Sequence, residues 1–224
     1  MRFMNVAIDG PAGAGKSTIA KACAKELGYI YVDTGAMYRG IALYMVDHKI
    51  RPTDIEAVKQ ALLDVNVTLR YEDGKQLLIV NGQDVSDRIR TPEVSAAASL
   101  FSAIPEVRKA LLDLQHDIAE KNNVLMDGRD IGTVILPQAQ VKIYLDASPE
   151  IRGKRRYDEL VLKGESVVLE DIIEDVKQRD YQDMHRETSP LKKADDAIVV
   201  DSSYMTIEEV QNKIVSLVRE KENA

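Results

Sequence analysis

The chain is poor in cysteine, with Cys23 as the single one among 224 residues. An intrachain disulfide is therefore excluded, and Cys23 falls on the apolar side of an expected helix, which indicates core filler rather than a nucleophile. No apolar run approaches the ~18 residues that a membrane-spanning helix needs, and residues 1–5 lead into an expected strand without the apolar core of a secretory signal. We expect a cytoplasmic protein with no membrane partner.

An excess of basic residues is also missing. The chain has 30 lysine and arginine residues against 37 aspartate and glutamate residues, which gives a net charge of −7. This balance argues against nucleic acid as the main partner, so any anion site must be a local cluster of arginines. The three histidines, His48, His116 and His185, form no recognisable catalytic dyad, and we expect surface or packing roles for them.

The residues that are present suit a single globular domain. A chain of this length buries a sizeable core, and its hydrophobic content of 45% and charged content of 30% are ordinary for one. Short apolar runs alternate with helical segments, which predicts an α/β fold with a five-stranded parallel sheet flanked by helices. The five expected strands are residues 6–9, 29–32, 124–127, 141–146 and 197–201.

Four of these strands end on or beside an aspartate, namely Asp9, Asp33, Asp127 and Asp146. In open α/β sheets the C-terminal ends of the strands carry the ligand site, so these carboxylates are candidates for function. For Asp9 and Asp146 a helix-capping or turn role is a sufficient explanation.

Residues 10–17 match G-x-x-x-x-G-K-[ST], the pattern of a loop that binds a nucleotide's phosphates. The loop lies between an expected strand and a helix over 19–27, which aims backbone N–H groups and the positive helix end at an anion. From a solvent-facing position, Lys16 would reach the β- and γ-phosphates, and the Ser17 hydroxyl would hold Mg²⁺. Asp127 is placed to hold a water on the same ion. The predicted nucleotide-binding residues are Gly10, Pro11, Ala12, Gly13, Ala14, Gly15, Lys16, Ser17 and Thr18.

Residues 65–90 break the alternation of strands and helices. Apolar and polar residues alternate in the first part of this segment, and Asp73-Gly74 and Asn81-Gly82 are strong hairpin signals. The segment therefore predicts a small three-stranded antiparallel sheet, with its third strand over about 84–89, inserted into the α/β core. We place the whole insert at about 36–104.

Helix-start signals surround the small sheet. The capping box Thr53-Asp54-Ile55-Glu56 opens one helix, Pro92 precedes a helix over 93–103, and Pro105 opens a further helix. A second capping box, at 206–209, opens the last helix of the chain.

Residues 149–184 are charged and helical, with a break near 163–166. A charged helical hairpin above a phosphate site is either a mobile lid, here over about 150–170, or a solvated pair of surface helices. Arg152 and Arg156 share one face of its first helix, where they would clamp a transferring phosphoryl group.

Further arginines follow the expected strands. A phosphate-binding loop alone does not separate a switch, a motor and a small-molecule kinase. Arg39 follows the second strand and Arg129 the third, so both are expected beside the phosphates. A helix puts Arg179, Asp183 and Arg186 on one face, which suits either recognition of a phosphorylated sugar or a surface ion pair.

Together these motifs resemble the bacterial cytidylate kinases, P-loop enzymes of the nucleoside monophosphate kinase type, over essentially the whole chain. The resemblance is carried by residues 8–17, 33–39, 127–133 and 179–186, and the insert looks like that family's enlarged monophosphate-binding region. It implies a P-loop kinase fold in one domain over 1–224, with ATP and Mg²⁺ serving phosphoryl transfer to CMP or dCMP. The products would be ADP and CDP or dCDP. The resemblance also favours a monomer.

The resemblance further implies a role for each matching position. The residues assigned to the acceptor's phosphate are Thr34, Arg39, Arg129 and Arg186. Those assigned to the cytosine edge are Ser99, Arg108 and Asp130, and those assigned to the sugar are Arg179 and Asp183. No strong general base is needed, because the attacking phosphate oxygen is already anionic. The predicted catalytic residues, which neutralise charge, are Lys16, Arg129, Arg152, Arg156 and Arg186.

Two other functions remain open from the residues alone. The first is another small-molecule P-loop kinase, acting on a sugar acid, shikimate or dephospho-coenzyme A. The insert and the Asp-Gly-Arg-Asp segment at 127–130 weigh against it. The second is a non-catalytic protein whose nucleotide state controls partner binding, and this leaves the arginine clusters unexplained.

Overall fold

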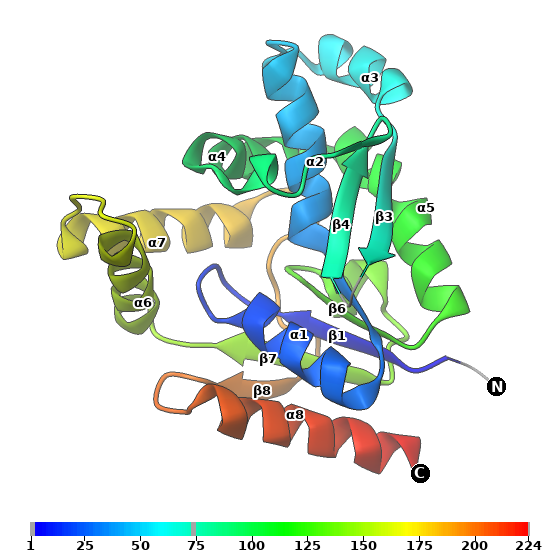
Figure 1. The fold of residues 1–224 in the computed structure, drawn as a ribbon, viewed down its shortest axis with the longest axis vertical. Coiled ribbons are helices and arrows are strands. Elements are labelled where there is room, and N and C mark those ends of the chain that lie inside the picture. Colours follow the sequence, from blue (N-terminus) through cyan, green and yellow to red (C-terminus); the bar gives the residue numbers. More distant parts are fainter. Residues whose placement is uncertain (1–2, 73–74, 224) are drawn as a thin grey trace.

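A computed structural model describes residues 3–72 and 75–223 of the chain. Its main element is a sheet of five parallel strands in the order β2-β6-β1-β7-β8, which confirms the predicted architecture (Figure 1). Two strands of this sheet, those expected at 29–32 and 197–201, begin one residue later than predicted. The strands are β1 (Asn5–Asp9), β2 (Ile30–Asp33), β6 (Val124–Gly128), β7 (Val141–Asp146) and β8 (Ile198–Asp201).

The register of the sheet brings the polar ends of three strands together. Asp33 at the end of β2 pairs with Asp127 on β6, and Asp9 at the end of β1 pairs with Gly128 on β6. Because β6 lies between β1 and β2, these side chains share one edge of the sheet. This is the edge at which parallel α/β sheets bind ligands.

Helices cover both faces of the sheet, and the strand residues alternate between two hydrophobic cores. Val6 and Ile8 share a core with side chains of α1 and α8, whereas Ala7 belongs to the core of α2 and α5. Cys23 is fully buried in the first of these cores, as predicted. The helices are α1 (Lys16–Leu27), α2 (Thr34–Asp47), α3 (Ile55–Asp64), α4 (Pro92–Phe101), α5 (Pro105–Lys121), α6 (Pro149–Leu162), α7 (Leu169–His185) and α8 (Ile207–Glu222).

The predicted antiparallel insert is present, with a shorter third strand than expected. Strands β3 (Val67–Glu72), β4 (Lys75–Val80) and β5 (Gln83–Asp84) form a sheet in chain order. The chain leaves β5 early because the carbonyl of Val85 accepts from the N–H groups of two residues in a 3₁₀ turn, Arg88–Arg90. The hairpin signal at Asn81-Gly82 is confirmed by positive φ at both residues, and the signal at 73–74 lies outside the described residues.

Helix starts agree with their sequence signals, with one exception. α4 and α5 begin at Pro92 and Pro105, and α8 begins after a capping box formed by Thr206 and Glu209. The predicted cap of α3 was one residue off: Asp54, not Thr53, accepts the N–H of a first-turn residue. Aspartate is among the strongest N-caps, which accounts for the shift.

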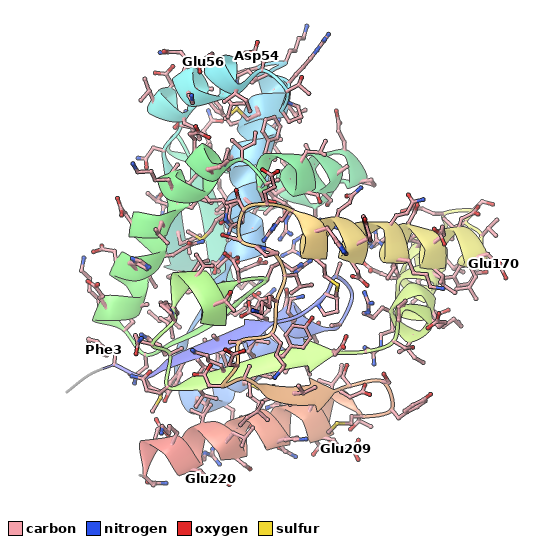
Figure 2. All side chains as sticks on the ribbon, turned by 180° about the vertical axis from the view of Figure 1, so that it is seen from behind. Phe3, Asp54, Glu56, Glu170, Glu209 and Glu220 are labelled. Carbon is pink, nitrogen blue, oxygen red and sulfur yellow. The ribbon has the colours of Figure 1, made fainter. Side chains whose placement is uncertain are left out.

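The charged segment forms the predicted helical hairpin from α6 and α7. The two helices pack closely at Gly153, where an added Cβ would lie 2.5 Å from the Cγ1 of Ile173. Their tip projects from the body of the molecule, with the exposed Glu170 at its far end (Figure 2). Among the described residues no helix has the length and apolar content needed to cross a membrane.

Candidate active site

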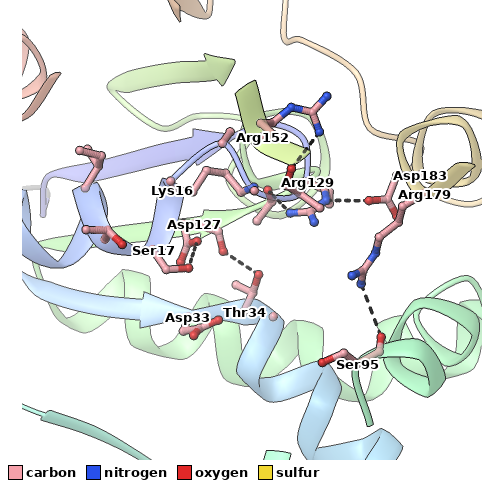
Figure 3. A pocket seen from close by; sticks show the side chains of 18 of the residues that line it. Lys16, Ser17, Asp33, Thr34, Ser95, Asp127, Arg129, Arg152, Arg179 and Asp183 are labelled. Carbon is pink, nitrogen blue, oxygen red and sulfur yellow. Dashed lines mark hydrogen bonds and ion pairs between the residues drawn. The ribbon is translucent and has the colours of Figure 1, made fainter. Parts of the chain in front are cut away.

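A cavity of about 730 Å³ opens at the C-terminal edge of the main sheet (Figure 3). It is lined by every residue that the sequence assigned to a site except Gly10 and Pro11. Gly10 instead allows a close backbone approach, since a Cβ there would lie 2.0 Å from the carbonyl oxygen of Leu145. The fold thus gathers the predicted site residues from segments far apart in the sequence into one space.

Lys16 begins α1 and, against expectation, is not solvent-facing. It is only 6% exposed, and its Nζ donates to the carbonyl of Pro11 at 2.7 Å. Burial, together with the nearby Arg129 guanidinium, lowers the pKa of Lys16 to about 7. An anion beside Nζ would favour the charged form, so the environment suits a phosphate ligand.

Ser17 and Asp127, the two residues predicted to hold a metal, lie in hydrogen-bond contact. The Ser17 Oγ donates to Oδ2 of Asp127 at 3.0 Å, and the Tyr31 hydroxyl donates to Oδ1 at 2.8 Å. Burial and the neighbouring Asp33 raise the pKa of Asp127 to about 6. In the described part of the chain no group of three or more His, Cys, Asp or Glu residues could hold a metal. Ser17 and Asp127 are hard oxygen donors, the type that Mg²⁺ takes alongside water and phosphate ligands.

Arginines line the other part of the cavity, and most are already paired. Arg129 Nε donates to Asp183 at 2.8 Å, and Arg39 lies 3.3 Å from the carboxylate of Asp33. Arg179 reaches the carbonyl of Ser95 at 3.5 Å. Figure 3 shows Arg129 between the Lys16–Ser17 side and the Arg179–Asp183 side of the cavity. Three buried guanidinium nitrogens there have no hydrogen-bond partner among the described residues: Arg39 Nε, Arg179 Nε and Arg186 Nη2.

Arg186 departs from the predicted single helix face. α7 ends at His185, and Arg186 follows in an extended conformation. Its Nε donates to the carbonyl of Ser189 at 2.7 Å, and its Nη2 lies 3.9 Å from Oδ1 of Asp130. The residue therefore reaches the same cavity as Arg179 and Asp183 from the segment after the helix, not from its face.

Asp130 and Arg108 form a buried ion pair at the cavity wall. Arg108 comes from α5 and also donates to the carbonyl of Ser102, and its guanidinium carbon lies 5.2 Å from the centroid of the Tyr38 ring. Ser99 lines the same space from α4. The cavity thus offers a buried carboxylate, a guanidinium and a hydroxyl in one region, which suits a polar heterocycle with donors and acceptors.

Asp9 does not cap the segment that follows it. Its two carboxylate oxygens accept from the N–H groups of Ile131 and Gly132, each at 2.7 Å, at the start of a π-helical turn, Ile131–Ile135. It therefore anchors the loop that carries Asp130. Asp146 has the expected turn role, because its side chain accepts from the N–H of Ala147.

Arg152 and Arg156 both line the cavity, but in different surroundings. Arg156 is exposed and pairs with Glu159 on its own helix. Arg152 is 2% exposed and is held by Asp180 of α7, and it donates to the carbonyl of Ala12 in the phosphate loop at 2.8 Å. Arg152 thus ties the hairpin to the loop, a contact that its sequence position did not indicate.

Sequence reasoning also missed several residues around the cavity. Tyr31, Ser95 and Asp180 each hold one of the predicted residues in place. Tyr31 lay in an expected strand and Asp180 in an expected charged helix, so neither pattern marked them as part of a site. Only their tertiary contacts reveal these supporting roles.

The phosphate loop, the serine–aspartate pair and the arginine cluster on one parallel sheet define a phosphotransferase of the P-loop kinase class. A family model described as "Cytidylate kinase" matches residues 6–220. The chain is 49% identical over 217 residues to a cytidylate kinase of Caldicellulosiruptor saccharolyticus, covering 97% of this chain and 96% of that one. It is 49% identical over 220 residues to a cytidylate kinase of Lactobacillus johnsonii, covering 98% and 96%. The chain therefore belongs to the cytidylate kinase family.

Among solved structures, an uncharacterized protein from Eubacterium ventriosum has a TM-score of 0.50 to this chain. The match covers 97% of this chain and 98% of that one at 14% sequence identity. A likeness at that identity shows a shared fold alone.

Proposed function

We propose that this protein is a (d)CMP kinase, which transfers the γ-phosphate of ATP to CMP or dCMP. The observation that carries the proposal is one cavity that contains two unlike regions. One region holds Lys16 and Ser17 beside a phosphate-binding loop, and the other holds the buried Arg108–Asp130 pair. Arg129 stands between the loop and the hairpin side of the cavity, where two phosphates would meet (Figure 3).

The acceptor region fits a cytidine monophosphate by its chemistry. The buried carboxylate of Asp130 can accept from the cytosine amino group, and Arg108 and Ser99 can meet the ring carbonyl and nitrogen. A uracil carbonyl in the place of that amino group would face the carboxylate without a proton to share. We assign Arg179 and Asp183 to the sugar.

The unpartnered guanidinium nitrogens mark the position we assign to the acceptor's phosphate. Arg39 and Arg186 each keep a buried N–H donor without a partner in the described chain, and an anion would satisfy both. Thr34 and Arg129 complete the group that we assign to this phosphate.

Catalysis in this arrangement is positioning together with charge neutralisation. A phosphate oxygen of the acceptor attacks the γ-phosphorus, the bond to the β-phosphate oxygen breaks, and ADP leaves. Lys16 and Arg129 would neutralise the charge that spreads over the transferring group, with Arg186 on the acceptor side. Arg156 would join them when the α6–α7 hairpin closes, whereas Arg152 would hold the phosphate loop in shape.

We propose Mg²⁺ as the metal of the reaction, held by the Ser17 hydroxyl and, through water, by Asp127. The hydroxyl–carboxylate pair fits the ion because both groups supply hard oxygen ligands. Bound Mg²⁺ supplies charge neutralisation on the β- and γ-phosphates. We further propose that the enzyme works as a cytoplasmic monomer on small molecules, with no nucleic-acid or membrane partner.

The test is ADP release measured with ATP and each of CMP, dCMP, UMP, AMP, shikimate and gluconate. The proposal expects turnover with CMP and dCMP far above that with every other acceptor. Preferred turnover of shikimate or gluconate would overturn it in favour of another small-molecule kinase. Slow hydrolysis of ATP that no acceptor accelerates would instead favour a nucleotide-controlled switch.

A further inference from the structure

The β2 strand lies at one end of the main sheet, so among residues 3–72 and 75–223 no strand pairs with its outward backbone groups. Two of these groups are instead bound by side chains of the β3–β4 hairpin. The Tyr71 hydroxyl donates to the carbonyl of Tyr31 at 3.1 Å, and the N–H of Asp33 donates to Oε1 of Gln76 at 3.0 Å. The hairpin therefore replaces a neighbouring strand at the point where β2 enters the site.

The side chain of Tyr31 connects this contact to the proposed metal site. Its buried hydroxyl donates to Oδ1 of Asp127 at 2.8 Å, while the Ser17 hydroxyl donates to Oδ2 at 3.0 Å. A phenol hydroxyl is protonated at neutral pH, so Tyr31 is the donor in its contact with Asp127. Each oxygen of the carboxylate is thus fixed by one hydroxyl group.

The hydrogen-bond directions leave the right atoms free for a cation. Because Ser17 gives its proton to Asp127, the lone pairs of the Ser17 oxygen remain available to a metal. Without Tyr31, only Ser17 would fix the carboxylate, and Asp127 could rotate about its side-chain bonds. The Tyr31 hydroxyl therefore affects how Ser17 and Asp127 are oriented toward an ion, although Tyr31 is not among the residues that line the cavity.

We infer that Tyr31 is a positioning residue for the metal site, held in place by the β3–β4 hairpin. The inference rests on the proposed function, because that function assigns Mg²⁺ to Ser17 and Asp127. Removal of a group that orients a metal ligand typically costs ~10–100-fold in metal affinity or activity. The hairpin belongs to the insert that also supplies Arg39 and Ser99 to the acceptor region, so the insert would support both halves of the site.

The first experiment compares Tyr31→Phe with a matched control, Tyr29→Phe. Tyr29 lies two residues away, and its hydroxyl donates to Glu222 of α8, outside the cavity. Mn²⁺ binding to the complex with a non-hydrolysable ATP analogue is measured by the electron paramagnetic resonance signal of free Mn²⁺. We expect ~10-fold or greater weakening in Tyr31→Phe and wild-type affinity in Tyr29→Phe.

Kinetics supply a second readout. Tyr31→Phe should raise the Mg²⁺ concentration for half-maximal turnover while the KM for CMP stays at the wild-type value. Tyr71→Phe, which loses only the contact to the Tyr31 carbonyl, should shift Mn²⁺ affinity in the same direction by a smaller factor. Wild-type Mn²⁺ affinity in Tyr71→Phe would overturn the claim that the β3–β4 hairpin holds Tyr31 in place.

The outcomes separate this inference from the proposed function. Wild-type Mn²⁺ affinity and Mg²⁺ dependence in Tyr31→Phe, even with a lower melting temperature, would show a merely structural tyrosine and overturn the inference. Loss of Mn²⁺ affinity in that variant would support it even where the wild-type enzyme fails to phosphorylate CMP. That last failure would overturn the proposed function alone.

Discussion

The two halves of the cavity are built in different ways. The phosphate-loop half is formed mainly by one continuous segment, residues 12–18, which side chains from distant segments, such as Asp127 and Arg152, contact. The arginine half takes its side chains from α2, α4, α5, α7, the segment after α7 and the turn after β6. A continuous motif binds a feature common to all nucleoside triphosphates, whereas a site assembled by tertiary packing can distinguish one acceptor from another.

The charges of the two halves are also balanced differently. Lys16 is a buried cation whose hydrogen bond is to a backbone carbonyl. In the arginine half several guanidinium groups are already paired within the protein, such as Arg39 with Asp33, Arg108 with Asp130 and Arg129 with Asp183. An acceptor must therefore match an existing arrangement of charge, while the loop offers its cation to any suitable phosphate.

The largest expected effect comes from breaking the loop half at its cation. Lys16→Met should lower kcat by ~10³-fold, because it removes a charge-neutralising donor from the transferring phosphoryl group. The melting temperature should not fall, since burial already disfavours the charged lysine and methionine fills similar space. Turnover and thermal unfolding are measured on the same preparation. A variant that keeps a tenth of the wild-type kcat would contradict the assigned role.

The next largest effect comes from breaking an ion pair in the arginine half. Arg129→Ala should lower kcat/KM for CMP and dCMP alike by ~10²-fold. It should also lower the melting temperature, because Asp183 is left buried without its partner. The double variant Arg129→Ala, Asp183→Asn should regain stability but not activity. Full activity in the single variant, with only a lower melting temperature, would assign Arg129 to the structure alone.

A smaller effect sharpens the comparison, because it concerns selectivity rather than rate. Asp130→Asn should narrow the ratio of kcat/KM for CMP over UMP by ~10-fold or more, chiefly by lowering the CMP value. The reason is that an amide donates as well as accepts, so it no longer rejects a carbonyl. An unchanged ratio would mean that Asp130 positions Arg108 and Arg186 without reading the base.

The smallest expected effect concerns Asp9, whose carboxylate binds the loop that carries Asp130. Burial raises the pKa of Asp9 to about 6. A carboxyl group whose pKa is higher in the folded chain than in the unfolded chain makes its full contribution to stability below about pH 4. That contribution is lost as the pH rises through about 6. The free energy of unfolding of the wild type relative to Asp9→Asn should fall over that window and be flat above it. A constant difference from pH 4 to 7 would contradict the shifted pKa.

The parts of the fold and site that the sequence predicted are those with local causes. Alternating apolar runs predicted the five strands, and Pro105 and Thr206 marked helix starts, because each depends on neighbours within a few residues. The family resemblance placed Ser99 and Arg108, which no local pattern marks.

The remaining features depend on contacts between distant segments. Asp9 binds the N–H of Gly132, and Lys16 is buried, for reasons that no local pattern records. Arg186 shows the same limit, since the spacing that suggested one helix face could not show where α7 ends.

The hydrogen bonds from the β3–β4 hairpin to the edge of β2 have a consequence for solubility. An open strand edge is a template for pairing with another chain, and hence for aggregation. Tyr71 and Gln76 occupy two outward backbone groups of β2, so a second molecule cannot pair with the strand there. The two edge strands, β2 and β8, have four residues each, too short to offer a long ladder. The contacts that connect the insert to the site therefore also protect the sheet from joining its own copies.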